Sequence, residues 1–286
     1  MMLEKELSVA ESVALEAGEA ILTIFHEGFE VNRKQVSEHY SEPVTIADIM
    51  ASRIIVERLA KEFPSDGILS EEEVDDVERR LASKRVWIID PLDGTKGFTE
   101  KRGDFAVQIG LVDDGEPILG VVYQPLGGSL YVAAKGAGSF LTSTNGKRKK
   151  LETSDLTEFT KMTMAASRSH RSRFMNRIHE HFDFGREYRH GSVGLKVGFL
   201  ASGTADIYIH MSPHTKYWDT AAPEIILTEA GGILTDIFGD KIDYTRRDVR
   251  NHNGIFATNG PVHEKAIAHL RPLLTEFGRL KVKAQG

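Results

Sequence analysis

The chain has 286 residues and a net charge of -6, from 36 basic and 42 acidic side chains, and 41% of its residues are hydrophobic. This length supports one large domain or two half-domains that share an interface. The charge balance argues against a bulk nucleic-acid binder, because such a protein presents a basic face. A mildly acidic protein that binds an anion needs metal ions or local cations to do so.

The sequence contains no cysteine, which excludes disulfides, thiolate nucleophiles and cysteine-ligated zinc. The residues at the N-terminus are too highly charged for a signal peptide. No apolar run approaches the about 18 residues that a membrane helix needs. We therefore expect a cytoplasmic protein whose partners include neither a membrane nor a nucleic-acid polymer.

Two amphipathic helices are predicted near the N-terminus. Apolar side chains recur at three-to-four-residue spacing over 4–27 and over 45–63. Gly28 is expected to end the first helix and Thr45 to cap the second. The period then changes, and apolar runs between turn residues predict the strands 86–89, 105–112, 118–123, 130–133 and 139–141.

Strands and helices alternate in the second half of the chain. The polar stretch 144–160 lacks a clear period, and we interpret it as the boundary between two subdomains, 1–150 and 151–286. The predicted strands are 162–165, 205–209 and 255–258, and the predicted helices are 171–182, 191–202, 219–230 and 261–275. This mixture predicts layered helices and sheets.

Two aspartates follow the first predicted strand. Asp90 ends that strand, and Asp93 comes three residues later within Asp-Pro-Leu-Asp-Gly-Thr. Pro91 fixes the direction of the chain and Gly94 permits a tight turn, so both carboxylates and the Leu92 carbonyl can be aimed at one point. Such oxygen ligands suit a hard cation like Mg²⁺. The alternative is a simple Asp-Gly turn, which needs only one aspartate.

A run of acidic residues lies between the second predicted helix and this motif. Ser70 and Glu73 have the spacing of a helix capping box, and acids favour a helix N-terminus. In the functional interpretation, Glu71 binds a metal ion and Glu72 lies behind it. The two interpretations are compatible, because a helix cap can fix the position of a ligand.

Two further aspartates lie at predicted helix starts. Asp219 follows Trp218 and begins the helix 219–230, where it is either an N-cap or a metal ligand from the second half of the chain. Asp48 lies in the first turn of the helix 45–63, where an acid is favourable in any case. Spacing alone does not decide either role.

Together, in this order and over nearly the whole chain, these segments resemble the inositol monophosphatase superfamily. The resemblance rests on Asp-Pro-Leu-Asp-Gly-Thr at 90–95, Trp-Asp at 218–219 and Glu-Ala-Gly-Gly at 229–232. The superfamily includes inositol monophosphatases, fructose-1,6-bisphosphatases and 3′(2′),5′-bisphosphate nucleotidases. It implies an α/β (α+β) fold, a layered α-β-α-β-α sandwich of the sugar-phosphatase type, with a Mg²⁺ cluster at the subdomain interface.

The resemblance also implies roles for individual residues. The metal ligands would be Glu71, Asp90, the Leu92 carbonyl, Asp93 and Asp219, the last from the second subdomain. Asp48 and Thr95 would orient the attacking water, with help from Glu72. The ligands Glu71, Leu92, Asp93 and Asp219 would also border the substrate, together with Gly94 and Thr95. Two or three Mg²⁺ ions are implied, with Mn²⁺ as a substitute and Li⁺ as an inhibitor, in a monomer or homodimer.

Within the superfamily, the sequence looks most like the CysQ-type 3′(2′),5′-bisphosphate nucleotidases. The likeness lies in Asp-Gly-Thr-Lys-Gly-Phe at 93–98, Ser-Arg-Ser-His at 167–170 and Asp-Tyr-Thr at 243–245. Gly-Ser-Val-Gly-Leu-Lys at 191–196 fits too, although the spacing from Ser192 to Lys196 is one residue longer than in some members. The implied reaction is hydrolysis of the 3′-phosphate of adenosine 3′,5′-bisphosphate by metal-activated water, a step of sulfur metabolism.

A bisphosphorylated substrate needs cations away from the reacting phosphate. Arg168, His170, Lys196 and Lys216 are the candidates, with Ser192 beside them. For each cation, the alternative is a solvated surface side chain.

Two other functions stay open. The chain could be an inositol-1-monophosphatase or a fructose-1,6-bisphosphatase, or a catalytically silent sensor of metal or phosphate. Against the sensor, every carboxylate that the chemistry requires is present.

Overall fold

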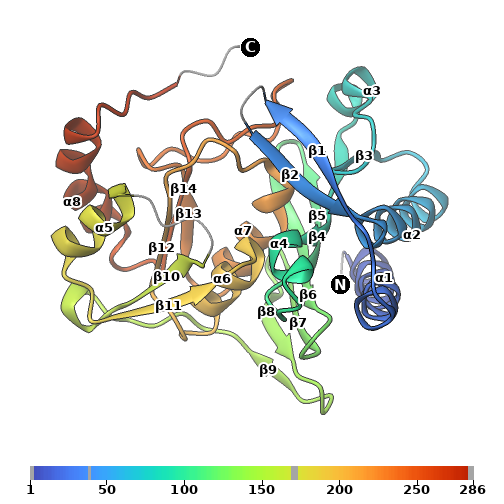
Figure 1. Cartoon of the computed structure of the whole chain (residues 1–286), viewed down its shortest axis with the longest axis horizontal. Helices are drawn as coiled ribbons and strands as arrows, with labels where there is room; N and C mark the ends of the chain where they lie inside the picture. The colour runs from blue at the N-terminus through green and yellow to red at the C-terminus, as the bar shows by residue number, and fades with distance from the viewer. Residues whose placement is uncertain (1–2, 38–39, 169–172, 283–286) are drawn as a thin grey trace.

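The computed structural model describes residues 3–37, 40–168 and 173–282 of the chain. Helices and sheets alternate in five layers (Figure 1): a helix pair, a seven-stranded sheet, a second helix pair, a five-stranded sheet and a third helix pair. Four groups of buried apolar residues fill the spaces between these elements. The expected α-β-α-β-α sandwich is confirmed.

The first layer consists of α1 (Glu4–Glu27) and α2 (Ile46–Glu62), which cover one face of the large sheet. Ile21, Ile55 and Trp87 are fully buried between them and the sheet. In spatial order, the sheet consists of β3 (Gly67–Ser70), β4 (Arg85–Asp93), β5 (Ala106–Asp113), β6 (Glu116–Gln124), β7 (Ser129–Ala134), β8 (Gly138–Thr142) and β9 (Arg148–Lys150). β3 pairs with β4 in parallel, and the other neighbours are antiparallel.

The middle layer consists of α6 (Val193–Ala201) and α7 (Ala221–Thr228). Gly110 and Gly120 pair across β5 and β6, and a Cβ atom on Gly120 would lie 2.4 Å from the Ala222 carbonyl oxygen. Since glycine has no Cβ, the backbone of α7 can approach the sheet this closely. The contact places the turn before α7 against β4, where the candidate metal ligands lie.

The second sheet is covered on its outer face by α5 (Arg173–Phe182) and α8 (His263–Glu276). In spatial order its strands are β11 (Arg186–His190), β10 (Thr163–Ser167), β12 (Ile207–His210), β14 (Ile255–Thr258) and β13 (Ile233–Thr235). β10 runs parallel to both of its neighbours, whereas β14 runs antiparallel to both of its own.

The remaining elements are short. An antiparallel hairpin of β1 (Val31–Ser37) and β2 (Tyr40–Thr45) leads into α2. α3 (Val77–Ala82) follows β3, and α4 (Thr95–Thr99) follows β4. Two 3₁₀ turns are η1 (Phe159–Lys161) and η2 (Tyr217–Asp219).

The predicted helices and strands are present, with small shifts at their ends. Gly28, at φ 100°, ends α1 as expected, and Thr45 caps α2 by accepting a hydrogen bond from the Ala47 amide. The predicted start of the helix 219–230 is wrong, because Asp219 belongs to η2 and Thr220 is the N-cap of α7. The division into subdomains near residue 150 stays a prediction.

Candidate metal centre

The end of β4 turns two carboxylates out of the sheet. Asp90 pairs with Gln108 of β5, the register then shifts, and Asp93 pairs with Ala106. Asp90 Oδ1 accepts a hydrogen bond of 3.0 Å from the Leu92 amide, which closes the turn between them. Gly94 follows at φ 94°, in the left-handed region that favours glycine. β4 thus runs on to Asp93 rather than ending at Asp90 as expected, with the register shift inside it, and both aspartates are buried.

Asp219 reaches the same point from the other half of the chain. Its Oδ2 accepts a hydrogen bond of 2.7 Å from the Lys216 amide, which holds the η2 turn. One carboxylate oxygen from each of Asp90, Asp93 and Asp219 lies within 4.8 Å of the others. The approach of α7 to the sheet therefore brings together two motifs that are far apart in the sequence, the Asp90–Asp93 segment and the turn that ends in Asp219.

Glu71 follows β3 next to this group. Its amide donates to the Ile89 carbonyl at 3.2 Å, which continues the pairing between β3 and β4. The capping-box interpretation of this segment is wrong, because the next helix begins only at Val77 with Asp76 as its cap. Ser70 and Glu73 instead both contact the Ser52 hydroxyl, at 3.1 Å each.

The electrostatics of the group favour a bound cation. Burial raises the pKa of Asp90 well above its usual value, and the charges of Glu71, Asp93 and Asp219 raise it further. Burial also raises the pKa of Asp93, against the effect of hydrogen bonds and of Lys196. Buried carboxylates that repel one another are costly unless a cation neutralises them. An all-oxygen ligand set of this kind fits Mg²⁺ or a similar hard ion.

Asp48 and Thr95 form a hydrogen-bonded pair beside the carboxylates. Thr95 Oγ1 lies 3.2 Å from Asp48 Oδ1 and 3.1 Å from the Leu92 carbonyl oxygen. The other oxygen of Asp48 accepts from the amide and the hydroxyl of Thr45, at 2.8 and 2.7 Å. Burial raises the pKa of Asp48 to about 6, and the Glu72 charge acts in the same direction. Asp48 is therefore both a helix cap and the partner of Thr95.

Lys196 lies beneath the site rather than on the surface. Its side chain is 1% exposed, and Nζ donates to the Gly191 carbonyl at 2.7 Å. Burial lowers the pKa of Lys196 to about 8, while the charges of Asp93 and Asp219 oppose that shift. The alternative of a solvated surface cation is wrong for this residue.

Known proteins have sequences similar to this one. A model of the inositol monophosphatase family matches residues 2–275. The 3′(2′),5′-bisphosphate nucleotidase CysQ of Escherichia coli K12 is 36% identical over 238 residues, which cover 82% of this chain and 92% of the relative. The CysQ of Salmonella typhimurium is 36% identical over 251 residues, covering 86% and 95%. The chain belongs to the inositol monophosphatase family.

Solved structures of the inositol monophosphatase family have the same fold. The Thermotoga maritima IMPase superposes with a TM-score of 0.81 at 25% identity, covering 96% of this chain and all of that one (100%). CysQ from Bacteroides thetaiotaomicron superposes with a TM-score of 0.75 at 30% identity, covering 90% and 98%.

Ser192 lies directly against Asp93. It begins the segment whose spacing, from Ser192 to Lys196, is one residue longer than in some members of the family. Ser192 Oγ donates to Asp93 Oδ2 at 2.5 Å, and the Gly194 amide donates to the same oxygen at 2.8 Å. Ser192 is also the N-cap of α6, since its Oγ accepts from the Leu195 amide at 3.1 Å. Ser192 therefore bonds to Asp93, a candidate metal ligand, and orients its carboxylate.

The other candidate cations differ in their surroundings. Arg168 forms an ion pair of 3.1 Å with Asp104, a buried acid that the sequence analysis missed, and donates to the Arg189 carbonyl at 3.1 Å. Lys216 Nζ lies 4.7 Å from the centre of the Trp218 ring. His170 lies outside the described residues.

Among the residues that the structure describes, no helix is long and apolar enough to cross a membrane.

Proposed function

We propose that this protein is a magnesium-dependent phosphomonoesterase that removes the 3′-phosphate of adenosine 3′,5′-bisphosphate. One observation carries the proposal: Asp90, Asp93 and Asp219, from separate elements, bring carboxylate oxygens within 4.8 Å of one another. They do so in a chain that is 36% identical to proteins named as 3′(2′),5′-bisphosphate nucleotidases. A monomer or homodimer in the cytoplasm stays a prediction.

The metal would be held by oxygen atoms alone. We assign it to the carboxylates of Glu71, Asp90, Asp93 and Asp219 and to the Leu92 carbonyl, with two or three Mg²⁺ ions, Mn²⁺ as a substitute and Li⁺ as an inhibitor. Bound cations of this kind neutralise the oxygens of a phosphoryl group and acidify an attacking water. Ser192 and the Gly194 amide hold the Asp93 carboxylate in place for this role.

Thr95 and Asp48 would handle the proton of the attacking water. When Thr95 donates its hydroxyl hydrogen to Asp48 Oδ1, at 3.2 Å, the Thr95 oxygen can accept a hydrogen bond from a water molecule. Burial raises the pKa of Asp48 in the metal-free site, which favours uptake of the proton by this carboxylate. Glu72 supports this by raising the same pKa.

Replacing Thr95 with alanine is expected to lower kcat by roughly 10²–10⁴-fold, the usual contribution of a positioned proton-transfer group. Mn²⁺ affinity should stay close to that of the wild type, because the four carboxylates remain. Thr99→Ala is the matched control, since Thr99 lies in the same short helix and its hydroxyl bonds to the Lys96 carbonyl at an exposed site. A fully active Thr95→Ala enzyme would contradict the assigned role.

Lys196, Ser192 and Arg168 are our candidates for binding the substrate beyond the reacting phosphate, with Lys216 and His170 as further cations. Arg168, Lys216 and His170 have donors that suit a phosphate oxygen. Lys196 is 1% exposed and the Ser192 hydroxyl donates to Asp93, so these two would act on the substrate through the charge of the site and through Asp93. The runner-up activity is that of an inositol-1-monophosphatase or a fructose-1,6-bisphosphatase, since the fold is also that of the Thermotoga IMPase.

A substrate panel tests the proposal. Adenosine 3′,5′-bisphosphate, inositol 1-phosphate and fructose 1,6-bisphosphate are each assayed for phosphate release with Mg²⁺ and with EDTA. We expect the highest kcat/KM for the nucleotide, no turnover in EDTA and recovery on adding Mg²⁺. A preference for inositol 1-phosphate would replace the substrate, and activity undiminished by chelator would reject the metal mechanism. No turnover of any phosphomonoester would favour the silent sensor.

A further inference from the structure

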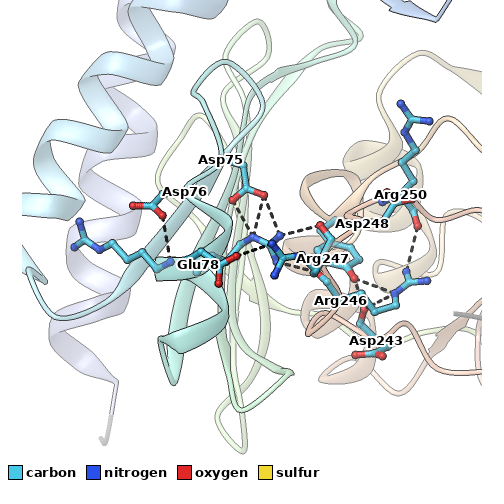
Figure 2. A network of polar contacts seen from close by, with 11 residues as sticks. Asp75, Asp76, Glu78, Asp243, Arg246, Arg247, Asp248 and Arg250 are labelled. Atoms are coloured by element: carbon cyan, nitrogen blue, oxygen red, sulfur yellow. Dashed lines mark hydrogen bonds and ion pairs between the residues drawn. The ribbon is translucent and has the colours of Figure 1, made fainter. Parts of the chain in front are cut away.

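The metal site has two flanks that are distant in the sequence. Glu71 begins the segment 71–82, which runs from β3 through α3. Asp219 ends the η2 turn, which lies against the loop 243–251. A network of polar contacts joins the segment 71–82 to this loop (Figure 2). The network lies outside the candidate metal ligands, and nothing in the proposed mechanism uses it.

Arg80 is the centre of this network. It is 4% exposed, and its Nε and Nη2 both donate to Asp75, at 2.9 Å each. Nη1 donates to the Arg246 carbonyl at 2.9 Å, and Nη2 donates to the Arg247 carbonyl at 3.0 Å. All three nitrogens of the guanidinium are used, and its charge is paired. A rigid planar fork with this many donors fixes the position of the groups that it contacts.

The loop in turn holds the turn that carries Asp219. Arg246 Nε donates to the Tyr217 hydroxyl at 3.0 Å, and the Tyr217 amide donates to the Val249 carbonyl at 3.0 Å. Asn251 Nδ2 donates to the Lys216 carbonyl at 2.9 Å. The loop therefore holds the η2 turn through both a side chain and the backbone, just before Asp219.

The other end of the network is close to Glu71. Asp75, the acid that pairs with Arg80, lies four residues after Glu71 in the same segment. Between them, Glu73 is tied to Ser52 of α2 at 3.1 Å. The short segment between Glu71 and Arg80 is thus anchored at Glu71, Glu73 and Asp75, and the bonds of Arg80 add to the constraints on the segment that carries the ligand.

We propose that Arg80 is a positioning residue for the metal centre, which sets the separation between Glu71 and Asp219 and thereby the affinity for divalent cations. The inference rests on the proposed metal site. The carboxylates of Glu71 and Asp219 both carry the same charge as Asp90 and lie close enough to act on it, so without a cation the three carboxylates repel one another. Arg80 is buried and each of its guanidinium nitrogens is hydrogen-bonded, so it resists the spreading of the two flanks.

A second ion pair spans the same gap and provides a control. Arg247 Nη2 lies 2.5 Å from Glu78 Oε1, but both side chains are well exposed, at 57% and 79%. Exposed pairs contribute little because water screens them. Removing the Arg247 side chain leaves its carbonyl, which accepts from Arg80.

The test measures Mn²⁺ binding to the full-length, substrate-free protein by electron paramagnetic resonance of the unbound ion. Arg80→Met is expected to weaken binding roughly 10-fold, as outer-sphere changes do at other metal sites. Arg80→Lys should weaken Mn²⁺ binding less, since the lysine ammonium replaces some of the hydrogen bonds of the guanidinium. Arg247→Met should bind Mn²⁺ like the wild type. At saturating Mg²⁺, kcat of Arg80→Met should approach the wild-type value, whereas a merely structural loss would not be recovered by metal.

A distance measurement keeps the inference testable if Arg80→Met does not fold. The chain has no cysteine, so spin labels at Val74→Cys and Arg250→Cys report only the gap between the two flanks; both positions are exposed. In the metal-free protein, Arg80→Lys should broaden the distance distribution, and Arg247→Met should not. Wild-type Mn²⁺ affinity together with an unchanged distribution in Arg80→Lys would overturn the inference. If the wild type itself bound no Mn²⁺, the proposed metal site would fail, and the inference with it.

Discussion

Asp90→Asn is expected to abolish activity and, at the same time, to raise the melting temperature of the metal-free protein. Asp90 is 2% exposed, and each of Glu71, Asp93 and Asp219 raises its pKa. The amide removes this repulsion, so Tm should rise by about 2–4 °C for each kcal/mol of repulsion relieved. Loss of a metal ligand should lower kcat/KM by roughly 10³-fold or more, since the cations supply most of the charge stabilisation.

Asp114→Asn is the matched control for Asp90→Asn. Asp114 lies in the exposed turn after β5 at φ 49°, a conformation that asparagine adopts well. It should change neither activity nor the effect of Mg²⁺ on Tm. The measurement is thermal unfolding in EDTA and in Mg²⁺, followed by circular dichroism, with kinetics on the same samples. A lower Tm for metal-free Asp90→Asn, or full activity, would contradict the account of this carboxylate.

Lys196→Met is expected to have the opposite effect on the metal-free protein. The lysine ammonium is buried and attracts Asp93 and Asp219, so its removal leaves those carboxylates uncompensated. Lys196 Nζ bonds to the Gly191 carbonyl and acts on the two aspartates through its charge, so the loss of stability should be smaller than the about 3–5 kcal/mol that breaking a close buried ion pair costs. Activity toward the bisphosphate should also fall, with a higher KM, because the charges of Asp93 and Asp219 are then less compensated next to an anionic substrate.

Lys161→Met serves as the control for the loss of a lysine, since Lys161 forms an exposed pair with Glu158 at 2.9 Å. It should leave stability nearly unchanged. Added Mg²⁺ should recover part of the stability of Lys196→Met, because the cation then neutralises the same carboxylates. If Lys196→Met were as stable as the wild type in EDTA, Lys196 would not be the counter-ion of the site.

The candidate metal ligands could be predicted from the sequence one motif at a time, but their meeting could not. The turn from Asp90 to Asp93 is specified locally by Pro91 and Gly94, so its geometry follows from short-range sterics. That Asp219 joins it depends on Gly110 and Gly120, which admit α7 to the face of the sheet. Such a contact between distant segments leaves no local pattern.

The electrostatic roles of Lys196 and Arg80 could not be predicted from the sequence either. A lysine in a sequence is expected in solvent, and the burial of Lys196 becomes visible only when α6 is placed between the sheets. Arg80 is a similar case: its sequence context is an ordinary charged helix, whereas its carbonyl partners lie in the loop 243–251.

The missed strands fall into two kinds: β3 and β13 are apolar but only four and three residues long, whereas β11, β1 and β2 lack apolar alternation. β11 reads Arg-Glu-Tyr-Arg-His and lies at the edge of its sheet, where charged residues protect the open side. β1 and β2 pair only with each other, and their sequence is also rich in polar residues. By contrast, α1 was predicted from end to end because its apolar face is continuous against the large sheet.

The central claim is that four acidic side chains converge to hold divalent ions. Crystals grown with Mn²⁺ and measured at its absorption edge test this directly, because anomalous peaks locate the ions without reference to any activity. The account predicts peaks between the carboxylates of Asp90, Asp93 and Asp219, with Glu71 and the Leu92 carbonyl completing the ligands. Crystals with bound Mn²⁺ elsewhere and no peak at these residues would contradict it.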